Sequence, residues 1–194
     1  MNKGMLIVIS GPSGVGKGTV LKHVFANDAN LVYSVSCTTR PPRVGETNGV
    51  EYHFISKEQF EDNIKNGKML EHAVYCDNYY GTGAEYVDKL RNEGRDVVLE
   101  IEVQGALQVM KKCEDAVTIF VAPPSFEELK SRLIGRGTES EEVIAARIAK
   151  ARDELSHMSE YTYKIVNDIV LKASNDILSI LKAERIKNIN LNII

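Results

Sequence analysis

The feature that most limits how this chain can fold is the junction between the apolar run MLIVIS, residues 5–10, and the glycine-rich run GPSGVGKGTV, residues 11–20. A short apolar run that ends at glycine predicts a buried strand, and a helix is predicted after the loop. Residues 11–17 fit the spacing G-x-x-x-x-G-K, a motif that requires a strand before it and a helix after it. The chain is therefore predicted to begin with a strand, a tight loop and a helix.

The chemistry of this loop favours an anionic ligand over an ordinary glycine-rich turn. Gly11, Gly14 and Gly16 let the backbone turn tightly and approach an anion without a clash from Cβ. Their N–H groups would point inward at the positive end of a helix. Lys17 would add a full charge for the β- and γ-phosphate oxygens of a nucleotide.

The fold class follows from the rest of the apolar pattern. Further buried strands are predicted at residues 96–103, 116–122 and 163–168. Near-continuous apolar runs are typical of parallel sheets that are covered on both faces. Helical patterns separate these runs, and a closing helix is expected over residues 175–188. The predicted fold is an α/β, doubly wound parallel-sheet core flanked by helices.

Two segments interrupt this alternation. Residues 35–95 contain short strand-like pieces punctuated by glycine and proline, which predicts an inserted subdomain with its own small sheet. Residues 127–155 predict a lid made of two charged helices. Capping-box spacing supports both helix starts, at Ser125 with Glu128 and at Thr138 with Glu141. The core would then comprise residues 1–34, 96–126 and 156–194.

Composition narrows the class of protein. The 194 residues carry a formal net charge of −3 and contain no basic tract, so no nucleic-acid partner is expected. The cysteines lack paired or metal-like spacing and fit a reducing compartment, the cytoplasm. No signal-peptide pattern and no run of 18 apolar residues occurs in the sequence, so no membrane association is expected. A monomer or a small homo-oligomer is expected.

Two acids occur in the apolar run VVLEIEV. Glu100 and Glu102 are two residues apart, so a strand would project both side chains from one face. Carboxylates on a buried strand are costly unless a cation meets them. The loop lysine and a phosphate-bound Mg²⁺ would do so. The alternative is two solvated acids at a strand edge.

Arginines gather in two places. Arg40 and Arg43 flank two prolines, which hold the segment extended, and guanidinium forks suit phosphate oxygens. Hydroxyls on nearby segments would also donate to a phosphate, from Tyr52, Tyr79 and Tyr80. The alternative is a pair of solvated arginines in a proline-rich loop.

The second group of arginines lies in the predicted lid. Arg132 and Arg136 share a helix face, and Arg147 and Arg152 follow on the next helix. A mobile segment with several arginines would close over a triphosphate and supply charge as a phosphoryl group moves. The alternative is surface pairing with the many nearby glutamates.

Seven segments together resemble the guanylate kinase family. They are GPSGVGKGT, SVSCTTRPPR, GVEYHF, NYYGT, LEIEVQG, GRGTES and IVND, in this order and spacing over about residues 5–170. The family belongs to the P-loop nucleoside monophosphate kinases. The resemblance therefore implies transfer of the γ-phosphoryl group of ATP to GMP, with Mg²⁺ as cofactor, ATP and GMP as partners, and dGMP as a further acceptor.

The resemblance also implies roles for individual residues. ATP would be held by Gly11, Pro12, Ser13, Gly14, Val15, Gly16, Lys17, Gly18, Thr19, Arg132, Arg136 and Asn167, with Asn167 beside the adenine. GMP would be held by Ser36, Arg40, Arg43, Tyr52, Glu71, Tyr80, Thr82, Glu100 and Glu102. The groups that act on the transferred phosphoryl group would be Lys17, Arg40, Arg43, Arg136 and Arg147. Thr19 and Glu102 would hold the metal through water.

Glu71 offers a physical reason for the preference for guanine that the resemblance implies. The pairing edge of guanine has N–H donors at N1 and N2 and an acceptor at O6. A carboxylate accepts from both donors, while hydroxyls such as those of Ser36 and Thr82 donate to O6. Adenine would place an acceptor against Glu71, and an unpaired buried group costs about 1–3 kcal/mol. The alternative for Glu71 is a surface acid at a strand end.

Three positions depart from the common family pattern. Gly18 stands where Ser or Thr usually follows the lysine, so a direct hydroxyl ligand to the metal is not expected there. Thr19, the next residue, would then contact an α-phosphate or hold the metal through water. Glu102 stands where aspartate is frequent, and Thr82 stands where serine is common.

Two other activities remain open from the sequence. The first is a nucleoside monophosphate kinase with another acceptor, such as AMP or dTMP. The second is a guanylate-kinase-like scaffold module that binds phosphorylated peptides without catalysis. The intact Lys17 and loop glycines, in a chain of 194 residues, favour the enzyme over the scaffold.

Overall fold

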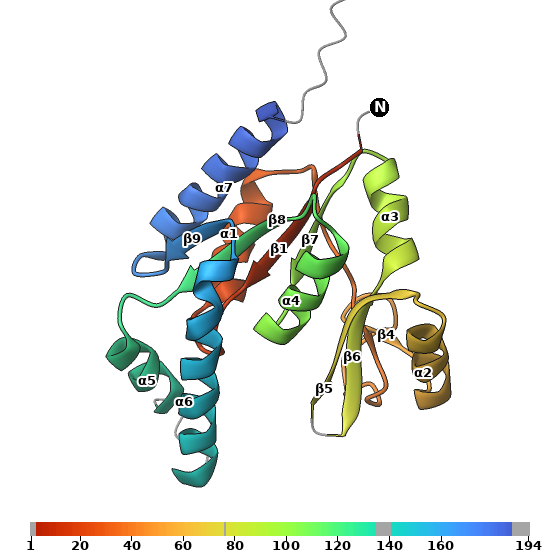
Figure 1. Cartoon of the computed structure of the whole chain (residues 1–194), viewed down its shortest axis with the longest axis horizontal. Coiled ribbons are helices and arrows are strands. Elements are labelled where there is room, and N and C mark those ends of the chain that lie inside the picture. Colours follow the sequence, from red (N-terminus) through yellow and green to blue (C-terminus); the bar gives the residue numbers. More distant parts are fainter. Residues whose placement is uncertain (1–2, 76, 135–140, 188–194) are drawn as a thin grey trace, which may run out of the picture.

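The core of the molecule is a five-stranded parallel sheet (Figure 1). The computed structural model describes residues 3–75, 77–134 and 141–187. In spatial order the strands are β2 (Leu31–Tyr33), β7 (Asp96–Glu100), β1 (Leu6–Ser10), β8 (Val117–Ala122) and β9 (Tyr163–Val166). Every pair of neighbouring strands is parallel. The predicted α/β class and the parallel-sheet core are confirmed.

Helices cover both faces of this sheet, as a parallel sheet requires. Ile7 and Ile9 of β1 face α1 (Lys17–Asn27) and α7 (Val170–Lys187), within a cluster that includes Leu21 and Ile177. Residues of the other parity in β1 pack with α3 (Ala84–Asn92) and α4 (Val103–Lys112). The strand residues of β1 are fully buried. The buried sheet therefore supports the loops that follow the carboxyl ends of its strands.

The strand order places the glycine-rich loop at the centre of that edge. The chain runs from β1 through α1 to β2 on one side, while β8 pairs with β1 on the other side. In open parallel sheets the crevice for ligands forms where the strand order reverses, outside the carboxyl ends of the strands. The loop after β1 occupies that position.

Two strand boundaries differ from the prediction. β7 ends at Glu100 instead of continuing to residue 103, because the chain turns at Ile101 and Glu102 into α4. β9 ends at Val166, and α7 begins at Val170, before the predicted residue 175. Apolar residues that continue past a strand into a buried helix face extend the hydrophobic pattern and hide the boundary.

The segment between β2 and β7 contains a second, four-stranded sheet. Its strands in spatial order are β4 (His53–Phe54), β3 (Cys37–Thr38), β6 (Asn78–Gly83) and β5 (Met69–Tyr75). α2 (Lys57–Lys65) packs on it through Phe60 and begins with a complete capping box between Ser56 and Gln59. The predicted small sheet is therefore present, and β6 is a strand that the hydrophobic pattern did not reveal.

α4 connects the two sheets. The amide of Gln108 pairs with both backbone groups of His72, accepting from its N–H at 3.1 Å and donating to its carbonyl at 2.8 Å. The Lys112 ammonium donates to the carbonyls of Met69 and Leu70 at 3.0 and 2.8 Å. One helix thus packs on the central sheet and fixes β5 of the smaller sheet.

Two further helices follow β8. α5 (Phe126–Ile134) and α6 (Glu141–Ser156) project from the same end of the central sheet as the four-stranded sheet does (Figure 1). The Glu128 N–H donates to the Ser125 hydroxyl at 3.1 Å, as the first capping box predicts. Thr138 of the second box lies outside the described residues. Among the described helices, none is both long and apolar enough to cross a bilayer.

Candidate active site

The glycines of the loop are required by its geometry. Gly14 and Gly16 have φ angles of 83° and 92°, in the left-handed region that glycine tolerates. A Cβ on Gly11 would lie 2.2 Å from the Val121 carbonyl oxygen, and one on Gly16 would lie 2.8 Å from the Asn167 side-chain nitrogen. Backbone N–H groups can approach an anion closely at these glycines because they have no Cβ.

Gly18 differs from the other loop glycines. A Cβ at this position would lie 3.7 Å from the nearest Glu100 carboxylate oxygen, an ordinary contact distance. Sterics therefore do not explain why glycine replaces the usual Ser or Thr. Thr19 follows in the first turn of α1 and is exposed, where its hydroxyl is open to a ligand or to water.

Lys17 folds back over its own loop. Its ammonium donates to the carbonyls of Gly11 at 2.6 Å and Pro12 at 3.3 Å. Burial lowers the pKa of the ammonium, and the nearby carboxylates of Glu100 and Glu154 oppose that shift. A cation with few polar partners besides two carbonyls is well placed to exchange them for phosphate oxygens.

The two predicted acids, Glu100 and Glu102, line one cavity, but they do not project from one face of a strand as predicted. Only Glu100 is in β7, and Glu102 lies beyond the strand as the residue that precedes α4. Both are exposed, so the predicted cost of buried carboxylates does not arise. Glu100 accepts from the Tyr33 hydroxyl at 3.0 Å, and Glu102 pairs with Lys150 at 2.8 Å.

One face of α6 contacts the loop. The Arg147 guanidinium donates to the Ser13 hydroxyl at 3.3 Å, and the Ser13 N–H donates to the Glu154 carboxylate at 3.4 Å. Glu154 is only 5% exposed, and burial raises the pKa of its carboxyl group. Sequence reasoning missed Glu154 and Lys150. The available signal was their spacing along one helix, because Lys150 lies three residues and Glu154 seven residues after Arg147.

Asn167 and Arg132 lie on the other side of the loop. The Asn167 side-chain amide donates to the Val15 carbonyl at 2.8 Å. Arg132 donates to the carbonyls of Val15 and Asn167, each at 3.4 Å. The Asn167 side-chain oxygen is buried and has no hydrogen-bond partner among the described residues, so an acceptor is available there. Arg136, the other predicted lid arginine, lies outside the described residues.

Most of the predicted acceptor residues line one cavity of about 400 Å³ between the two sheets. It is lined by Ser36, Arg40, Arg43, Glu46, Tyr52, Glu71, Ala73, Tyr80, Gly81, Glu100, Ile101, Glu102 and Gly105. Thr82 does not line the cavity itself, but its hydroxyl contacts Glu71, which does. Tyr79 does not line it, because its ring stacks on Phe60 with centroids 5.1 Å apart. Sequence reasoning missed Glu46 and Gly105.

Glu71 lies at the floor of this cavity. It is 5% exposed, and burial raises the pKa of its carboxyl group. The Thr82 hydroxyl donates to one carboxylate oxygen at 2.7 Å, so its hydrogen is committed to Glu71 and not to a ligand. A Cβ on Gly105 of α4 would lie 2.6 Å from the other oxygen. The absence of a side chain at Gly105 therefore lets the carboxylate occupy its position.

A second group in the lining of the cavity surrounds Arg40, which lies among aromatic rings. Its guanidinium carbon is 5.5 Å from the centroid of Tyr52 and 5.7 Å from that of Phe54. The Tyr80 hydroxyl also interacts with this guanidinium. Arg43 is exposed at the rim. The lining of the cavity thus includes a buried acid, Glu71, that suits N–H donors and two arginines, Arg40 and Arg43, that suit an anion.

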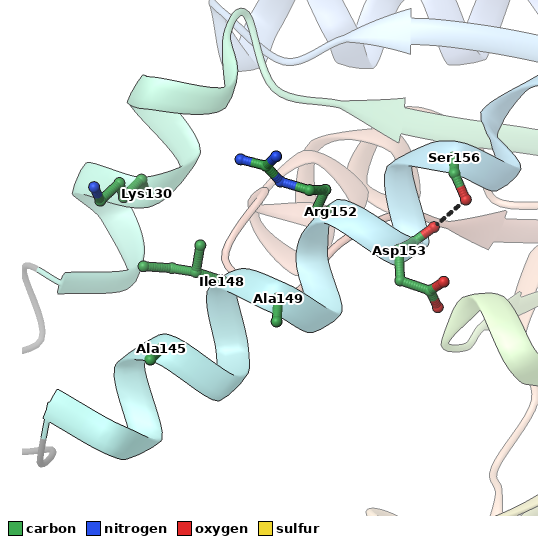
Figure 2. Close-up of a pocket in the computed structure, with 7 residues that line it drawn as sticks. All are labelled: Lys130, Ala145, Ile148, Ala149, Arg152, Asp153 and Ser156. Atoms are coloured by element: carbon green, nitrogen blue, oxygen red, sulfur yellow. Dashed lines mark hydrogen bonds between the residues drawn. The ribbon is translucent and has the colours of Figure 1, made fainter.

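A second, more open cavity of about 690 Å³ lies between α5 and α6 (Figure 2). Lys130 of α5 faces a largely aliphatic stretch of α6 that includes Ile148 and Ala149. Arg152 lies here with its guanidinium 4.8 Å from the Phe126 ring centroid. Arg152 is therefore engaged between the two helices. Size alone does not identify the site, because this cavity lacks converging polar groups.

The donor chemistry at the carboxyl edge suits Mg²⁺ better than a softer metal. The candidate ligands are the Thr19 hydroxyl and the carboxylates of Glu100 and Glu102, all of them oxygen donors. Among residues 3–75, 77–134 and 141–187, no cluster of three or more metal-ligating side chains occurs. These residues thus fit an ion that keeps its waters and substrate oxygens as ligands, as Mg²⁺ does at phosphate sites.

Comparisons with known proteins agree with this arrangement. The guanylate kinase family model matches residues 3–184. A guanylate kinase of Lactococcus lactis is 54% identical over 182 residues, covering 94% of this chain and 89% of that protein. One from Streptococcus thermophilus is 56% identical over 186 residues, with 95% and 89% covered.

A solved structure points the same way. The crystal structure of guanylate kinase from Anaplasma phagocytophilum matches with a TM-score of 0.72 at 35% identity, covering 95% of this chain and 87% of that one. The family match spans the glycine-rich loop, the acceptor cavity and the lid helices. The chain belongs to the guanylate kinase family.

Proposed function

We propose that this chain transfers the γ-phosphoryl group of ATP to GMP, giving ADP and GDP. The observation that carries the proposal is that the buried Glu71 carboxylate and the Arg40 guanidinium line one cavity of about 400 Å³. The base of GMP would lie against the first and its phosphate against the second. The family's activity supports the same assignment.

The geometry of Glu71 refines how guanine would be read. Because the Thr82 hydroxyl donates to the carboxylate, Thr82 orients Glu71 rather than donating to O6. The free oxygen of Glu71 faces Gly105 and the cavity, where it accepts from N1–H and N2–H of guanine. Ser36 remains as the hydroxyl donor for O6. None of these contacts involves the ribose, so dGMP would serve as a second acceptor.

On the donor side, the loop residues 11–19 would hold the ATP phosphates. Lys17 would leave its two carbonyl partners and bind phosphate oxygens. The unpartnered Asn167 oxygen would accept from the adenine amino group, with Arg132 beside it. Arg147 of α6 already contacts Ser13, so it would lie near the transferred group. Arg136 would join it from the lid.

The reaction would be a direct in-line displacement. An oxygen of the GMP phosphate attacks the γ-phosphorus, and the bond from that phosphorus to the β–γ bridging oxygen breaks. The acceptor is already an anion, so no general base is required, and positioning with charge neutralisation supplies most of the acceleration. Arg40 and Arg43 would hold the acceptor, while Lys17 and Arg147 would neutralise the developing charge.

Mg²⁺, when bound with ATP, would neutralise and orient the β- and γ-phosphate oxygens. Thr19 and Glu102 would reach it through water. Glu102 is paired with Lys150, which favours an indirect contact over direct coordination. Closure of α5 and α6 would exclude water from the transfer and so suppress hydrolysis of ATP.

A coupled assay of ADP release tests this proposal. The purified chain would be given MgATP with GMP, dGMP, AMP, CMP, UMP or dTMP in turn. Turnover is expected with GMP and dGMP, and lower by at least about 10-fold with AMP because of the unpaired acceptor at Glu71. Preference for AMP or a pyrimidine monophosphate would refute the assignment of the acceptor.

A further inference from the structure

Glu46 makes a set of contacts that phosphoryl transfer to GMP does not by itself explain. Its two carboxylate oxygens accept from the two terminal nitrogens of Arg40, at 2.9 and 3.0 Å. The same carboxylate accepts from the backbone N–H of Arg43 at 2.7 Å. The side chains of Arg40 and Glu46 are only 13% and 17% exposed. One acid thus contacts both of the arginines that line the cavity.

These contacts fix one edge of the Arg40 guanidinium and leave the other. A guanidinium has five N–H groups, and Glu46 with the Pro41 carbonyl takes three of them, the last at 2.7 Å. The Nε–H and one terminal hydrogen remain on the opposite edge, and the Tyr80 hydroxyl, which also lines the cavity, interacts with the same guanidinium. Tyr52 and Phe54 flank the group. Arg40 therefore presents two parallel donors in a fixed orientation, a fork that matches a phosphate.

A carboxylate in an anion site needs a physical reason. Glu46 lines the same cavity as Arg40 and Arg43, so its charge repels any phosphate that binds there. Hydrogen bonds from Arg40 and from the Arg43 backbone lower the pKa of Glu46, so it stays ionised. This repulsion is offset only if an Arg40 guanidinium held by Glu46 binds phosphate better than one that is free to rotate.

We propose that Glu46 is a positioning residue for the acceptor phosphate, which holds the Arg40 guanidinium by one edge so that the other edge receives the phosphate of the monophosphate substrate. This rests on the proposed function. Glu46 keeps its contacts when the substrate is bound. The competing arrangement is a Glu46 that only fills the phosphate position until substrate displaces it, and the two arrangements predict opposite effects of removing the charge.

The test compares Glu46→Gln with Glu51→Gln. Glu51 lies in the same loop, is exposed, and accepts from the Thr47 N–H at 2.7 Å, so the control removes the same charge from a loop-ordering acid. For Glu46→Gln the KM for GMP is expected to rise about 10-fold, with the KM for ATP changed less than about twofold. Glu51→Gln is expected to leave both constants within about twofold. An unchanged or lower KM for GMP in Glu46→Gln overturns the proposal.

A double-mutant cycle shows whether Glu46 acts through Arg40. Lysine at position 40 keeps a charge but has no planar fork for Glu46 to hold. Adding Glu46→Gln to Arg40→Lys is therefore expected to change the KM for GMP less than about twofold further. Independent, multiplying effects would mean that Glu46 acts elsewhere and would overturn the proposal.

Competitive inhibition by guanosine separates positioning from collapse of the loop. Guanosine lacks the phosphate, so its inhibition constant is expected to be the same in Glu46→Gln and the unsubstituted chain. A parallel loss of guanosine binding overturns the proposal. If Glu46→Gln does not fold, Glu46→Asp tests the same idea, because it keeps the charge but shortens the reach and should also raise the KM for GMP. A chain that never phosphorylates GMP refutes the proposed function itself, whereas normal turnover with an indifferent Glu46 refutes only this inference.

Discussion

The two halves of the site are built from different materials. The donor half is one continuous loop, residues 11–19, whose shape depends on three glycines and which would present mostly backbone N–H groups to a phosphate. The acceptor half is a cavity whose side chains come from both sheets and from α4. Each of its important side chains is held by another, as Glu71 is by Thr82 and Arg40 is by Glu46.

This difference separates what each half can recognise. Backbone amides bind any phosphate chain, so the donor half would recognise the charge and shape of the phosphates and not the identity of the base. The acceptor half would recognise the hydrogen-bonding edge of a base through side chains, and substitution of those side chains can change which base binds. We therefore expect changes in the donor half to abolish transfer, and changes in the acceptor half to alter which monophosphate is used.

Lys17→Ala tests the donor half and should have the largest effect. Loss of the cation is expected to lower kcat by about 10³-fold, because it removes charge neutralisation from the transferred group. GMP affinity, measured by calorimetry, should stay within about twofold. Lys172→Ala is the matched control, since Lys172 is an exposed α7 lysine that pairs only weakly with Asp168 at 3.7 Å. Comparable turnover of Lys17→Ala would contradict the role of the loop.

Glu71→Gln tests the acceptor half. The substitution places an amide donor against the donors of guanine, so the KM for GMP should rise by about 10- to 100-fold while the KM for ATP is unchanged. Glu61→Gln, an exposed acid of the same subdomain that accepts from the Tyr79 hydroxyl, should leave both unchanged. Equal losses for the two nucleotides would place Glu71 outside the base site.

The same carboxylate predicts a pH dependence. Burial raises the pKa of Glu71 above the ordinary value of 4.5, so it takes up a proton at a pH where exposed glutamates remain ionised. A protonated Glu71 accepts less well from guanine. GMP affinity should therefore fall as the pH is lowered through this raised pKa, and the fall should be absent in Glu71→Gln. A parallel fall in both proteins would assign the titration to another group.

Gly105→Ala sharpens the comparison, because it changes the acceptor half without removing a polar group. The new methyl group would displace the Glu71 carboxylate, and the KM for GMP should rise about 10-fold. Alanine is about 1 kcal/mol better than glycine inside a helix, so the melting temperature should not fall as it would for a damaged core. Gly83→Ala, where a Cβ meets nothing within 4 Å, is the control. A normal KM for GMP would mean that Glu71 has room to move.

Glu154→Gln should have the smallest effect and concerns stability. Burial raises the folded-state pKa of Glu154 above 4.5, so the folded protein binds more protons than the unfolded chain between these two values. The free energy of unfolding therefore falls as the pH rises through that window. Glutamine does not ionise, so the variant should be about 1 kcal/mol more stable at about pH 8 and equal to the unsubstituted chain at about pH 4. Urea unfolding at both pH values measures this, and a difference independent of pH would argue against the shift.

Much of the fold and of the donor half was predictable because the signals are local. A strand, a loop motif and a helix are adjacent in sequence, and the apolar runs of β1, β8 and β9 fall where the structure has strands. The prediction for β7 ran too far because Val103 belongs to the buried face of α4 and continues the same apolar pattern.

The acceptor half was less accessible to prediction because its geometry depends on long-range contacts. Nothing near Gly105 in the sequence indicates that it lies against Glu71, 34 residues away. Glu46 was not singled out, because its contacts with Arg40 and with the Arg43 backbone depend on how residues 40–46 turn back on themselves. A phosphate-binding role for Arg40 was inferred from its chemistry, whereas the role of Glu71 came from the family resemblance, and both roles in binding GMP are proposals.

The contacts between α4 and β5 have a consequence for how the protein behaves in concentrated solution. β5 is the last strand of the smaller sheet, and an unpaired edge is a template for strands of other chains. Gln108 occupies the amide and carbonyl of His72, and Lys112 occupies the carbonyls of Met69 and Leu70. Side chains of α4 thereby occupy the hydrogen-bonding groups that another strand would use, so this stretch of the edge is closed to self-association.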